Sequence, residues 1–442
     1  MKRVLSLFFL SITAFSQAQY NLSTTYCEHN DLNASRYEPS ELHLGNKHVQ
    51  IGSNFYFWIA NNAIDYATIK KFRQGEPITE QEIDNFVNNL QERNQIGAGQ
   101  DFQIGGVAFQ LGGFALSLSA VDRFAMEMNY SRNLMKLAWK GNKQFAGQRT
   151  QLGPLSFNAH YTREYAVGMA FNIVGNMEKG LRVGARGKYI QGMGSIYMPK
   201  SDLYLTTAAD GRSIEAEFDY KLQTSGIRNF NGMNFNGMGY GVDAGISAYL
   251  SKHFEINASL LDFGAVTYNK DVKTYQKQGK YLYEGAVISN FFGDPRYNLD
   301  SISSLFKPEE TSGGSYTMNL GTRVFLQGEL KWGGNMDEEL EEGEEYQGHS
   351  IFFTYIQGLN NMPGTTTKPY FSVAYNYDLR RMFNFGVSAS MGGYNRYAAG
   401  AFLAFNLMHI LKIGIGSDNL MPLVQPKLGT GADVCVNVSV AF

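Results

Sequence analysis

Histidines are the side chains in this sequence best suited to acid–base chemistry. An enzyme needs a nucleophile, a base and an oxyanion donor close together, or a set of carboxylates and histidines. The histidines are scattered, and none lies in a G-x-S-x-G or H-E-x-x-H pattern. The seven are His29, His43, His48, His160, His253, His349 and His409. The sequence therefore predicts no catalytic residue and a protein that is not an enzyme.

The densest charge in the chain is an acidic run at residues 337–345. Oxygen-rich clusters of this kind can bind Ca²⁺, but the run lacks the alternate-position spacing of an EF-hand loop. The pattern favours a solvated turn over a metal site, with contact to a partner protein as a further use. No metal and no cofactor is predicted.

The segment 229–238 repeats Asn, Gly, Met and Phe. Methionine-rich surfaces adapt to hydrophobic or variable ligands. The simpler alternative is a disordered outer loop.

The elements that would position such residues are strands, and the last of them is the clearest. Strict alternation predicts a strand with one apolar face and one small or polar face. The apolar positions are Val434, Val436, Val438, Val440 and Phe442. A terminal strand that ends on Phe is what outer-membrane β-barrels use to close and to be recognised by the barrel-assembly machinery. A strand of a secreted β-sandwich is the alternative, because alternation is a weak signal in any one segment.

The first residues read as a secretory signal at 1–18. Lys2 and Arg3 supply the positive end, an apolar run follows, and Ser16-Gln17-Ala18 resembles a cleavage site. A membrane anchor is the alternative, but it needs roughly 20 apolar residues. Export with cleavage is therefore predicted.

The composition fits a barrel of strands. Aromatic residues make up 14% of the 442 residues and there are 48 glycines, as expected for strands, tight turns and aromatic girdles. The mean hydropathy of -0.26 is compatible with a membrane location, because barrel strands turn half their residues to a polar interior. A net charge of -2 provides no basic field for nucleic acid.

Fourteen segments carry the strand pattern, joined alternately by short turns and long excursions, which is the asymmetry of bacterial barrels. An all-β, transmembrane antiparallel barrel at 47–442 is predicted, with the last strand paired to the first. The segments are 47–60, 102–111, 114–130, 155–174, 181–196, 239–250, 254–268, 317–331, 350–358, 370–377, 382–391, 397–405, 411–416 and 432–442.

Some connections have features of their own. The excursion 201–224 reads as a hairpin turned at Asp210-Gly211 that prolongs two strands beyond the membrane, whereas 269–316 reads as an outer connection. The polar stretch 19–46 shows no period and is predicted to be a periplasmic or lumenal segment.

A helical insert at 61–95 interrupts the strands. Two short helices are predicted, the second behind a Thr79-x-x-Glu82 capping box. Its apolar stripe is Ile83, Phe86, Val87 and Leu90. The stripe could pack the insert on the barrel rim or serve as a gate inside the pore, and both interpretations stay open.

Two cysteines in an exported protein allow one disulfide, Cys27 to Cys435. Cys435 falls on the small face of the last strand, which is predicted to be lumenal. The bond would hold the N-terminal segment inside the barrel mouth. Two unpaired thiols are the alternative.

Short motifs along the chain resemble a family of uncharacterised outer-membrane barrels from Bacteroidota. They lie at 137–142, 145–147, 161–165, 184–192, 239–245 and 261–264. That family resembles the long-chain fatty-acid transporter (FadL-like) superfamily, which includes an outer-membrane shuttle of the type IX secretion system. The resemblance implies a fourteen-stranded barrel and no established activity. The chain differs from the transporters in placing its helices after strand one, where theirs form an N-terminal hatch.

These observations favour passive transport of small hydrophobic molecules across the outer membrane of a Gram-negative bacterium. The alternative is a non-transporting partner or scaffold in cell-surface assembly or type IX secretion. The partners expected are outer-membrane lipid, the barrel-assembly machinery, a hydrophobic small molecule or another protein, and no nucleic acid.

Overall fold

The computed structural model describes residues 20–27, 31–76, 79–175, 179–228, 234–283, 308–333, 348–379, 382–394, 396–408 and 410–442. Three sequence features lie wholly or partly outside these residues: the secretory signal at 1–18, the acidic run at 337–345 and the first part of the Asn-Gly-Met segment, 229–233. His29 and His409 lie outside them as well.

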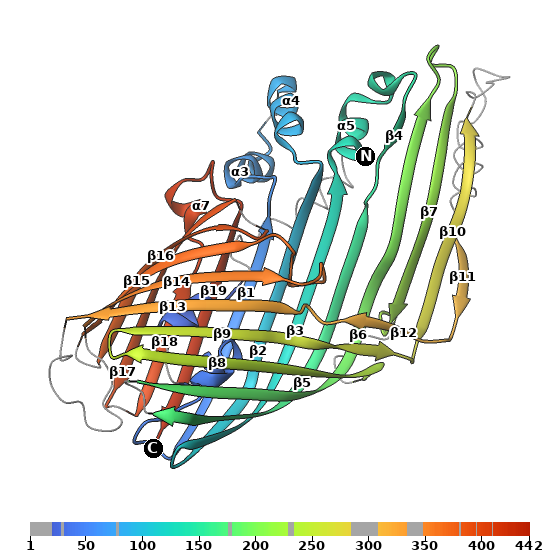
Figure 1. The fold of residues 1–442 in the computed structure, drawn as a ribbon. Coiled ribbons are helices and arrows are strands. Elements are labelled where there is room, and N and C mark those ends of the chain that lie inside the picture. The colour runs from blue at the N-terminus through green and yellow to red at the C-terminus, as the bar shows by residue number, and fades with distance from the viewer. Residues whose placement is uncertain are drawn as a thin grey trace.

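Fourteen strands form a closed antiparallel barrel, as the alternation predicted (Figure 1). Each strand pairs with its neighbour in the chain, and β19 returns to pair with β1. In chain order they are β1 (Val49–Asn61), β2 (Arg93–Leu111), β3 (Phe114–Ser131), β5 (Ser156–Gly175), β6 (Gly180–Thr207), β8 (Gly237–Ser251), β9 (Phe254–Tyr268), β13 (Arg323–Trp332), β14 (Gly348–Gly358), β15 (Tyr370–Leu379), β16 (Phe383–Gly392), β17 (Tyr397–Leu407), β18 (Leu411–Ser417) and β19 (Gly431–Ala441). The short β12 (Tyr316–Asn319) precedes β13 and also pairs with β9.

The side chains of the last strand alternate between the interior and the outer surface of the barrel. Cys435, Asn437 and Ser439 are 1–2% exposed and face the interior, whereas Val434 and Val438 are more than a third exposed. The closing register sets Tyr56 of β1 opposite Cys435. Alternation along a strand sends successive side chains to opposite faces, so the same sequence builds both the lumen and the outer wall.

The two ends of the barrel differ. The C-terminus lies at one end, where short turns such as Gly112-Gly113 join β2 to β3 (Figure 1). At the other end the strands run on into an extension made of the upper part of β6 together with β4 (Arg149–Gln151), β7 (Ile214–Ser225), β10 (Val272–Tyr283) and β11 (Glu309–Ser312).

The extension confirms one prediction and corrects another. β6 and β7 are the hairpin expected around Asp210-Gly211, because β6 ends at Thr207 and β7 begins at Ile214. The region 269–316 is not only a connection, since β10 pairs with β7 along its whole length. Most side chains of β10 are exposed or half-buried, so its sequence lacks the apolar alternation of a strand that packs against a core.

The helices of the insert lie at the same end as the extension (Figure 1). They are α3 (Tyr66–Gln74) and α4 (Glu80–Asn89), and α5 (Arg132–Lys140) lies beside them. The Thr79–Glu82 capping box forms as its sequence predicted. Two further short helices among the described residues are η3 (Lys143–Phe145) and α7 (Met421–Val424). Among the described residues no helix is long and apolar enough to cross a membrane.

Candidate functional site: the lumenal plug

The described part of the N-terminal segment fills the lumen. It contains α2 (Leu22–Cys27), η1 (Ala34–Arg36) and η2 (Pro39–Glu41), none of which the sequence predicted. Side chains from Tyr20 to Leu42 are almost all under 9% exposed, although many are polar. We call residues 20–27 and 31–44 the plug. Of the two locations considered for this segment, the structure has the lumenal one.

Local polar chemistry, not an apolar stripe, shapes the plug. The Asn21 side chain accepts hydrogen bonds from the Thr24 backbone N–H at 3.3 Å and from its hydroxyl at 2.8 Å, which caps α2. Asp31 accepts from the Asn33 backbone N–H at 2.7 Å in the manner of an Asx turn. Such residues favour caps and turns over long helices.

Helix α2 is fastened to the inner wall near the closing strand. The Leu22 backbone N–H donates to Asp418 at 2.8 Å, and the Thr24 hydroxyl lies 3.1 Å from the Cys435 sulfur. On the opposite side the Tyr26 hydroxyl donates to Ser372 at 3.0 Å. These partners belong to β15, β19 and the β18–β19 connection, so α2 lies along the inner wall formed by the consecutive strands β15 to β19.

An aromatic patch on the inner wall lies under α2. Tyr26 has its ring centroid 5.0 Å from that of Phe352 and 5.7 Å from that of Phe402. Tyr20 meets Tyr370 edge to face at 5.2 Å. The wall side of this cluster, which we call the aromatic patch, consists of Leu261, Phe325, Phe352, Ile356, Tyr370, Ala374, Phe402 and Ala404. The lumen is therefore not uniformly polar.

The middle of the plug is held by ion pairs. Arg36 Nη2 lies 3.0 Å from Asp101 Oδ2, and Arg36 also donates to Asn54 at 3.2 Å. Nearby, Gln50 of β1 donates to Asp31 at 2.6 Å and accepts from the Leu32 backbone N–H at 3.0 Å. Strands β1 and β2 thus bind the plug through those of their side chains that face the lumen.

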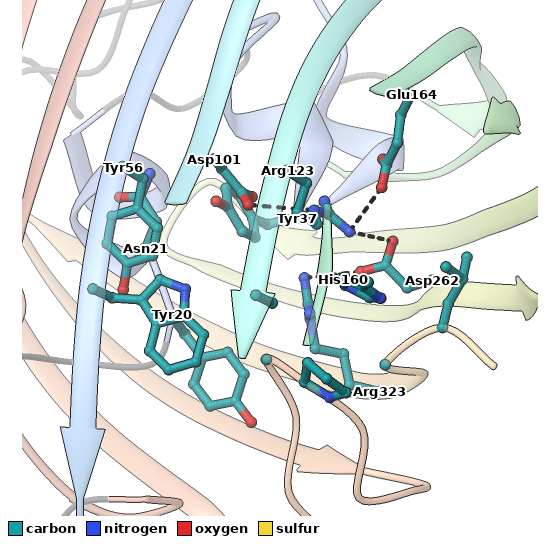
Figure 2. Close-up of a pocket in the computed structure, with 16 residues that line it drawn as sticks. Tyr20, Asn21, Tyr37, Tyr56, Asp101, Arg123, His160, Glu164, Asp262 and Arg323 are labelled. Atoms are coloured by element: carbon teal, nitrogen blue, oxygen red, sulfur yellow. Dashed lines mark hydrogen bonds and ion pairs between the residues drawn. The ribbon is translucent and has the colours of Figure 1, made fainter. Parts of the chain in front are cut away.

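The wall around the plug carries a buried network of opposite charges. Arg123 reaches Asp101 at 3.3 Å, Glu164 at 3.2 Å and Asp262 at 3.0 Å (Figure 2). The other pairs are Arg186–Asp243, Lys188–Asp243, Lys188–Asp262 and Arg323–Asp262. Buried charges persist when they are paired in this way, and the network balances four cations with four carboxylates.

Carboxylates dominate the part of the lumen nearest the short turns. Glu41 of the plug accepts from Ser247 and from the Tyr249 hydroxyl, the latter at 3.0 Å. On the wall, Lys331 bridges Glu255 at 3.1 Å and Glu329 at 3.2 Å. Burial and the neighbouring carboxylate raise the pKa of Glu41 to about 8. Burial likewise raises the pKa of Glu38 well above its ordinary value.

Only a small cavity of about 40 Å³ remains beside the charge network, lined by Tyr20, Arg123, His160 and Arg323 among others (Figure 2). That volume suits a few water molecules, each of which needs on the order of 10–15 Å³ of such space. Binding sites for small organic molecules span roughly 300–1,000 Å³. This cavity is too small to hold one of them.

The candidate gate residues of α4 lie at the rim. Val87 and Leu90 are at most 1% exposed, and Leu90 packs on Ile96 and Tyr130 at the ends of β2 and β3. Ile83 and Phe86 are half-buried. Of the two interpretations of the stripe, the position of α4 agrees with packing on the rim. A role in gating stays a prediction.

The predicted disulfide also stays a prediction. Cys435 is buried against Thr24, which lies one helical turn before Cys27. The side chain of Cys27 lies outside the described residues.

Histidines do not gather in the part of the chain that the structure describes. His160 lines the small cavity, whereas His349 lies 2.7 Å from the Tyr375 hydroxyl at the end of β14. Within that part, no group of three or more His, Cys, Asp or Glu side chains is arranged to hold a metal ion.

The residues that sequence reasoning missed are the charged ones of the lumen. Arg36 and Glu41 stand in a segment without a period, so nothing local marked them as buried. Arg182, Arg186 and Lys188 of β6 lie at even spacing, which places them on one face of a strand. That spacing was the available signal for an inward row of cations.

The chain was compared with curated proteins, solved structures and family models. No curated protein matches the chain significantly. Among solved structures, the chain is similar to the toluene transporter TodX of P. putida, with 9% identity, a TM-score of 0.47, and coverage of 93% of this chain and 94% of that one. A FadL homologue of Pseudomonas aeruginosa has 12% identity, a TM-score of 0.44, and coverage of 97% and 99%.

The monoaromatic hydrocarbon channel CymD has 9% identity, a TM-score of 0.35, and coverage of 94% of both chains. Transporter and channel barrels for fatty acids and hydrocarbons are therefore among the solved structures to which this chain is similar. An origin in Bacteroidota stays a prediction. A family model matches residues 44–418, and the chain accordingly belongs to the family of unknown function DUF5723.

Proposed function

We propose that this protein is an outer-membrane barrel that passes small hydrophobic molecules when its plug moves. The observation that carries the proposal is the aromatic patch beneath α2. Leu22 and Tyr26 occupy the surface that an apolar molecule would contact if α2 withdrew. A barrel of this size has a lumen that must be filled or left open, and the plug fills it.

The outer wall supports a membrane location. Large apolar side chains on the outward face are 40–60% exposed on strands all around the barrel, for example Val167, Val242, Phe371, Val387 and Ile415. We call this surface the apolar belt. Exposure of so much apolar surface to water would be unfavourable, whereas acyl chains cover it without cost.

The contacts of the plug are suited to reversible closure. Polar and charged groups make most of them, and water can replace each hydrogen bond when the plug leaves, so the net contribution of each is only about 1 kcal/mol. The plug makes apolar contacts at two places: α2 on the aromatic patch, and Leu32, Leu42 and Leu44 on alanines of β2, β3 and β5. If α2 moved away, an apolar molecule would take the place of Leu22 and Tyr26 on the aromatic patch.

A disulfide lock tests the proposal. Ser40 of the plug and Ser247 of β8 have hydroxyl oxygens 2.7 Å apart, close enough for cysteines at these positions to bond. The Ser40→Cys/Ser247→Cys variant is reconstituted in liposomes and uptake of a hydrophobic dye is measured. We expect uptake to stop on oxidation and to return on reduction.

Two controls accompany the lock. The single Ser40→Cys variant and the natural chain, each oxidised and reduced, show any contribution of Cys27 or Cys435. Dye uptake that is equal in the locked and reduced double variants would overturn passage through the plugged lumen.

A partner role in cell-surface assembly or type IX secretion is the second candidate. The observation that favours it is the extension of β6, β7 and β10, which projects beyond the barrel and carries exposed ion pairs such as Lys200–Asp219 and Arg149–Glu217 (Figure 1). Affinity purification from native membranes tests it. Recovery of the barrel alone would count against this candidate.

A further inference from the structure

The outward face of β5, β6 and β8 has three tyrosines in one row. Tyr165 pairs across strands with Tyr189, and Tyr189 pairs with Tyr240. The ring centroids of the first pair are 6.5 Å apart and those of the second 5.9 Å. Tyr165 and Tyr240 are 43% and 64% exposed, so the row stands on the outer surface.

The row below the tyrosines has a gap in it. There, Val167 pairs with Gly187, and Gly187 pairs with Val242. A Cβ added to Gly187 would have no heavy atom within 4 Å, and the same is true of Gly105 on β2. Missing side chains between exposed valines leave a hollow in an otherwise apolar wall.

The hollow is a groove of about 820 Å³, which we call the tyrosine groove. Its size lies in the range of roughly 300–1,000 Å³ typical of small-molecule sites. It is lined by Gly105, Gly106, Val107, Leu118, Ser119, Ala120, Tyr165, Ala166, Val167, Gly187, Lys188, Tyr189, Tyr240, Gly241 and Val242. Lys188 turns its ammonium group inward to Asp243 and Asp262, so the charge itself belongs to the lumen.

The row above the tyrosines is polar. Arg163 pairs across strands with Asp122 on one side and with Gln191 on the other. Its guanidinium holds Asp122 with two hydrogen bonds of 2.6 and 2.8 Å, and the Tyr161 hydroxyl donates to the same carboxylate at 2.9 Å. Charged, aromatic and apolar rows follow one another along the strands, which is the order found at a membrane interface.

We propose that the tyrosine groove binds one acyl chain of a membrane lipid, whose polar head lies against Arg163 and Gln191. The groove opens directly onto the apolar belt, so whatever covers that belt also reaches the groove. A chain entering between Val167 and Val242 buries apolar area that a flat wall would not offer. The hydroxyl groups of the three tyrosines then lie at the boundary between the polar head and the acyl chain of the lipid. This inference rests on the membrane location in the proposed function, and not on passage through the lumen.

Photo-crosslinking tests the inference. The full-length protein is reconstituted with phosphatidylethanolamine that carries a diazirine on its acyl chain, and adducts are mapped by mass spectrometry. We expect adducts at 165–167, 187–189 and 240–242 to exceed those on the belt of β15 and β16 by about tenfold, which corresponds to a preference of about 1.4 kcal/mol. Uniform labelling would mean annular lipid only and would overturn the inference.

A pair of matched glycine variants sharpens the test. Gly187→Leu fills the groove and should abolish the enrichment. Gly328→Leu on β13 adds the same side chain to the outer wall outside the groove, with the nearest heavy atom 4.0 Å from its Cβ, and should leave the enrichment intact. Equal loss in both variants would overturn the inference. A dimeric mass without bound lipid in native mass spectrometry would assign the groove to a second copy instead.

Separate measurements report whether each variant folds, whether it lies in a membrane and whether it binds lipid. Heat-dependent mobility in gels reports whether each variant forms the barrel, and Tyr189→Leu provides a second variant that alters the groove without filling it at Gly187. Flotation with liposomes tests the membrane location, and its failure would overturn the proposed function. Lipid enrichment that is lost while dye uptake persists would support the groove independently of the lumen.

Discussion

The N-terminal segment and the helical insert were both candidates to fill this barrel, and in the structure they lie in different places. The plug, polar and without period, lies in the lumen, while the amphipathic helices of the insert lie on the rim. The reason is the chemistry of the wall. Most inward side chains are polar or charged, so they satisfy a polar segment. The stripe of α4 needs an apolar surface, which Ile96 and Tyr130 offer to Leu90. An apolar stripe is therefore a poor guide to what enters a barrel.

The largest expected difference between the two segments is in permeability. Deletion of 20–46 removes the filling of the lumen and should raise uptake of a hydrophobic dye on the order of tenfold, because an unfilled barrel of this size encloses a channel. Deletion of 63–93 should leave uptake near the level of the natural chain. Dye uptake into liposomes measures both. A rise only in the second deletion would reverse the comparison and make α4 the gate.

A single ion pair should account for much of the hold on the plug. Arg36→Ala removes the plug's hydrogen bond to Asp101, which keeps its ion pair with Arg123, so the loss is expected to be about 2 kcal/mol. We expect a cysteine introduced at Ser40 to react faster with a water-soluble maleimide in this variant. Lys71→Ala serves as the control, since it removes an exposed pair on α3. Equal rates in the two variants would contradict a latch at Arg36.

Docking of the plug should weaken as the pH rises. Burial raises the pKa of Glu41 to about 8 in the docked state, above the ordinary 4.5 that solvent would restore on release. The docked state thus binds the proton more tightly, so docking is favoured most below pH 4.5 and loses stability up to about pH 8. Labelling at Ser40→Cys should accelerate over this window. Glu41→Gln should flatten the profile, and an unchanged slope would exclude Glu41 as its source.

The smallest effects are expected in the insert. Leu90→Ala should destabilise the rim locally by about 3 kcal/mol through lost packing, and Thr79→Ala by about 1 kcal/mol through the lost cap. Limited proteolysis of the insert measures both. Dye uptake should not change in either variant. A parallel rise in uptake would show that rim packing and closure are coupled.

Strand positions were predictable because their signal is local. Alternation at 432–442 specified both the strand and its inward residues, and Cys435 lies on the face expected of it. The strands of the extension were harder to predict. β10 pairs with β7 without burying an apolar face, so its sequence reads as a loop.

The candidate site was predictable only in outline. Inward charges such as Arg186 and Lys188 follow from strand periodicity, yet their partners Asp243 and Asp262 lie on other strands. Arg36 and Glu41 lie in a segment whose sequence shows no hydrophobic periodicity. Their burial depends on partners on other strands, Asp101 for Arg36 and Ser247 with Tyr249 for Glu41.

The sequence by itself determined the strands, their inward and outward faces and the capped helix behind Thr79. These follow from short-range periodicity and capping, which each segment carries within itself. Tertiary structure alone decided that the polar leader is the plug, that the helices stay on the rim and that three tyrosines from separate strands frame a groove. Those outcomes depend on strand register and on closure of the barrel, which no single segment encodes.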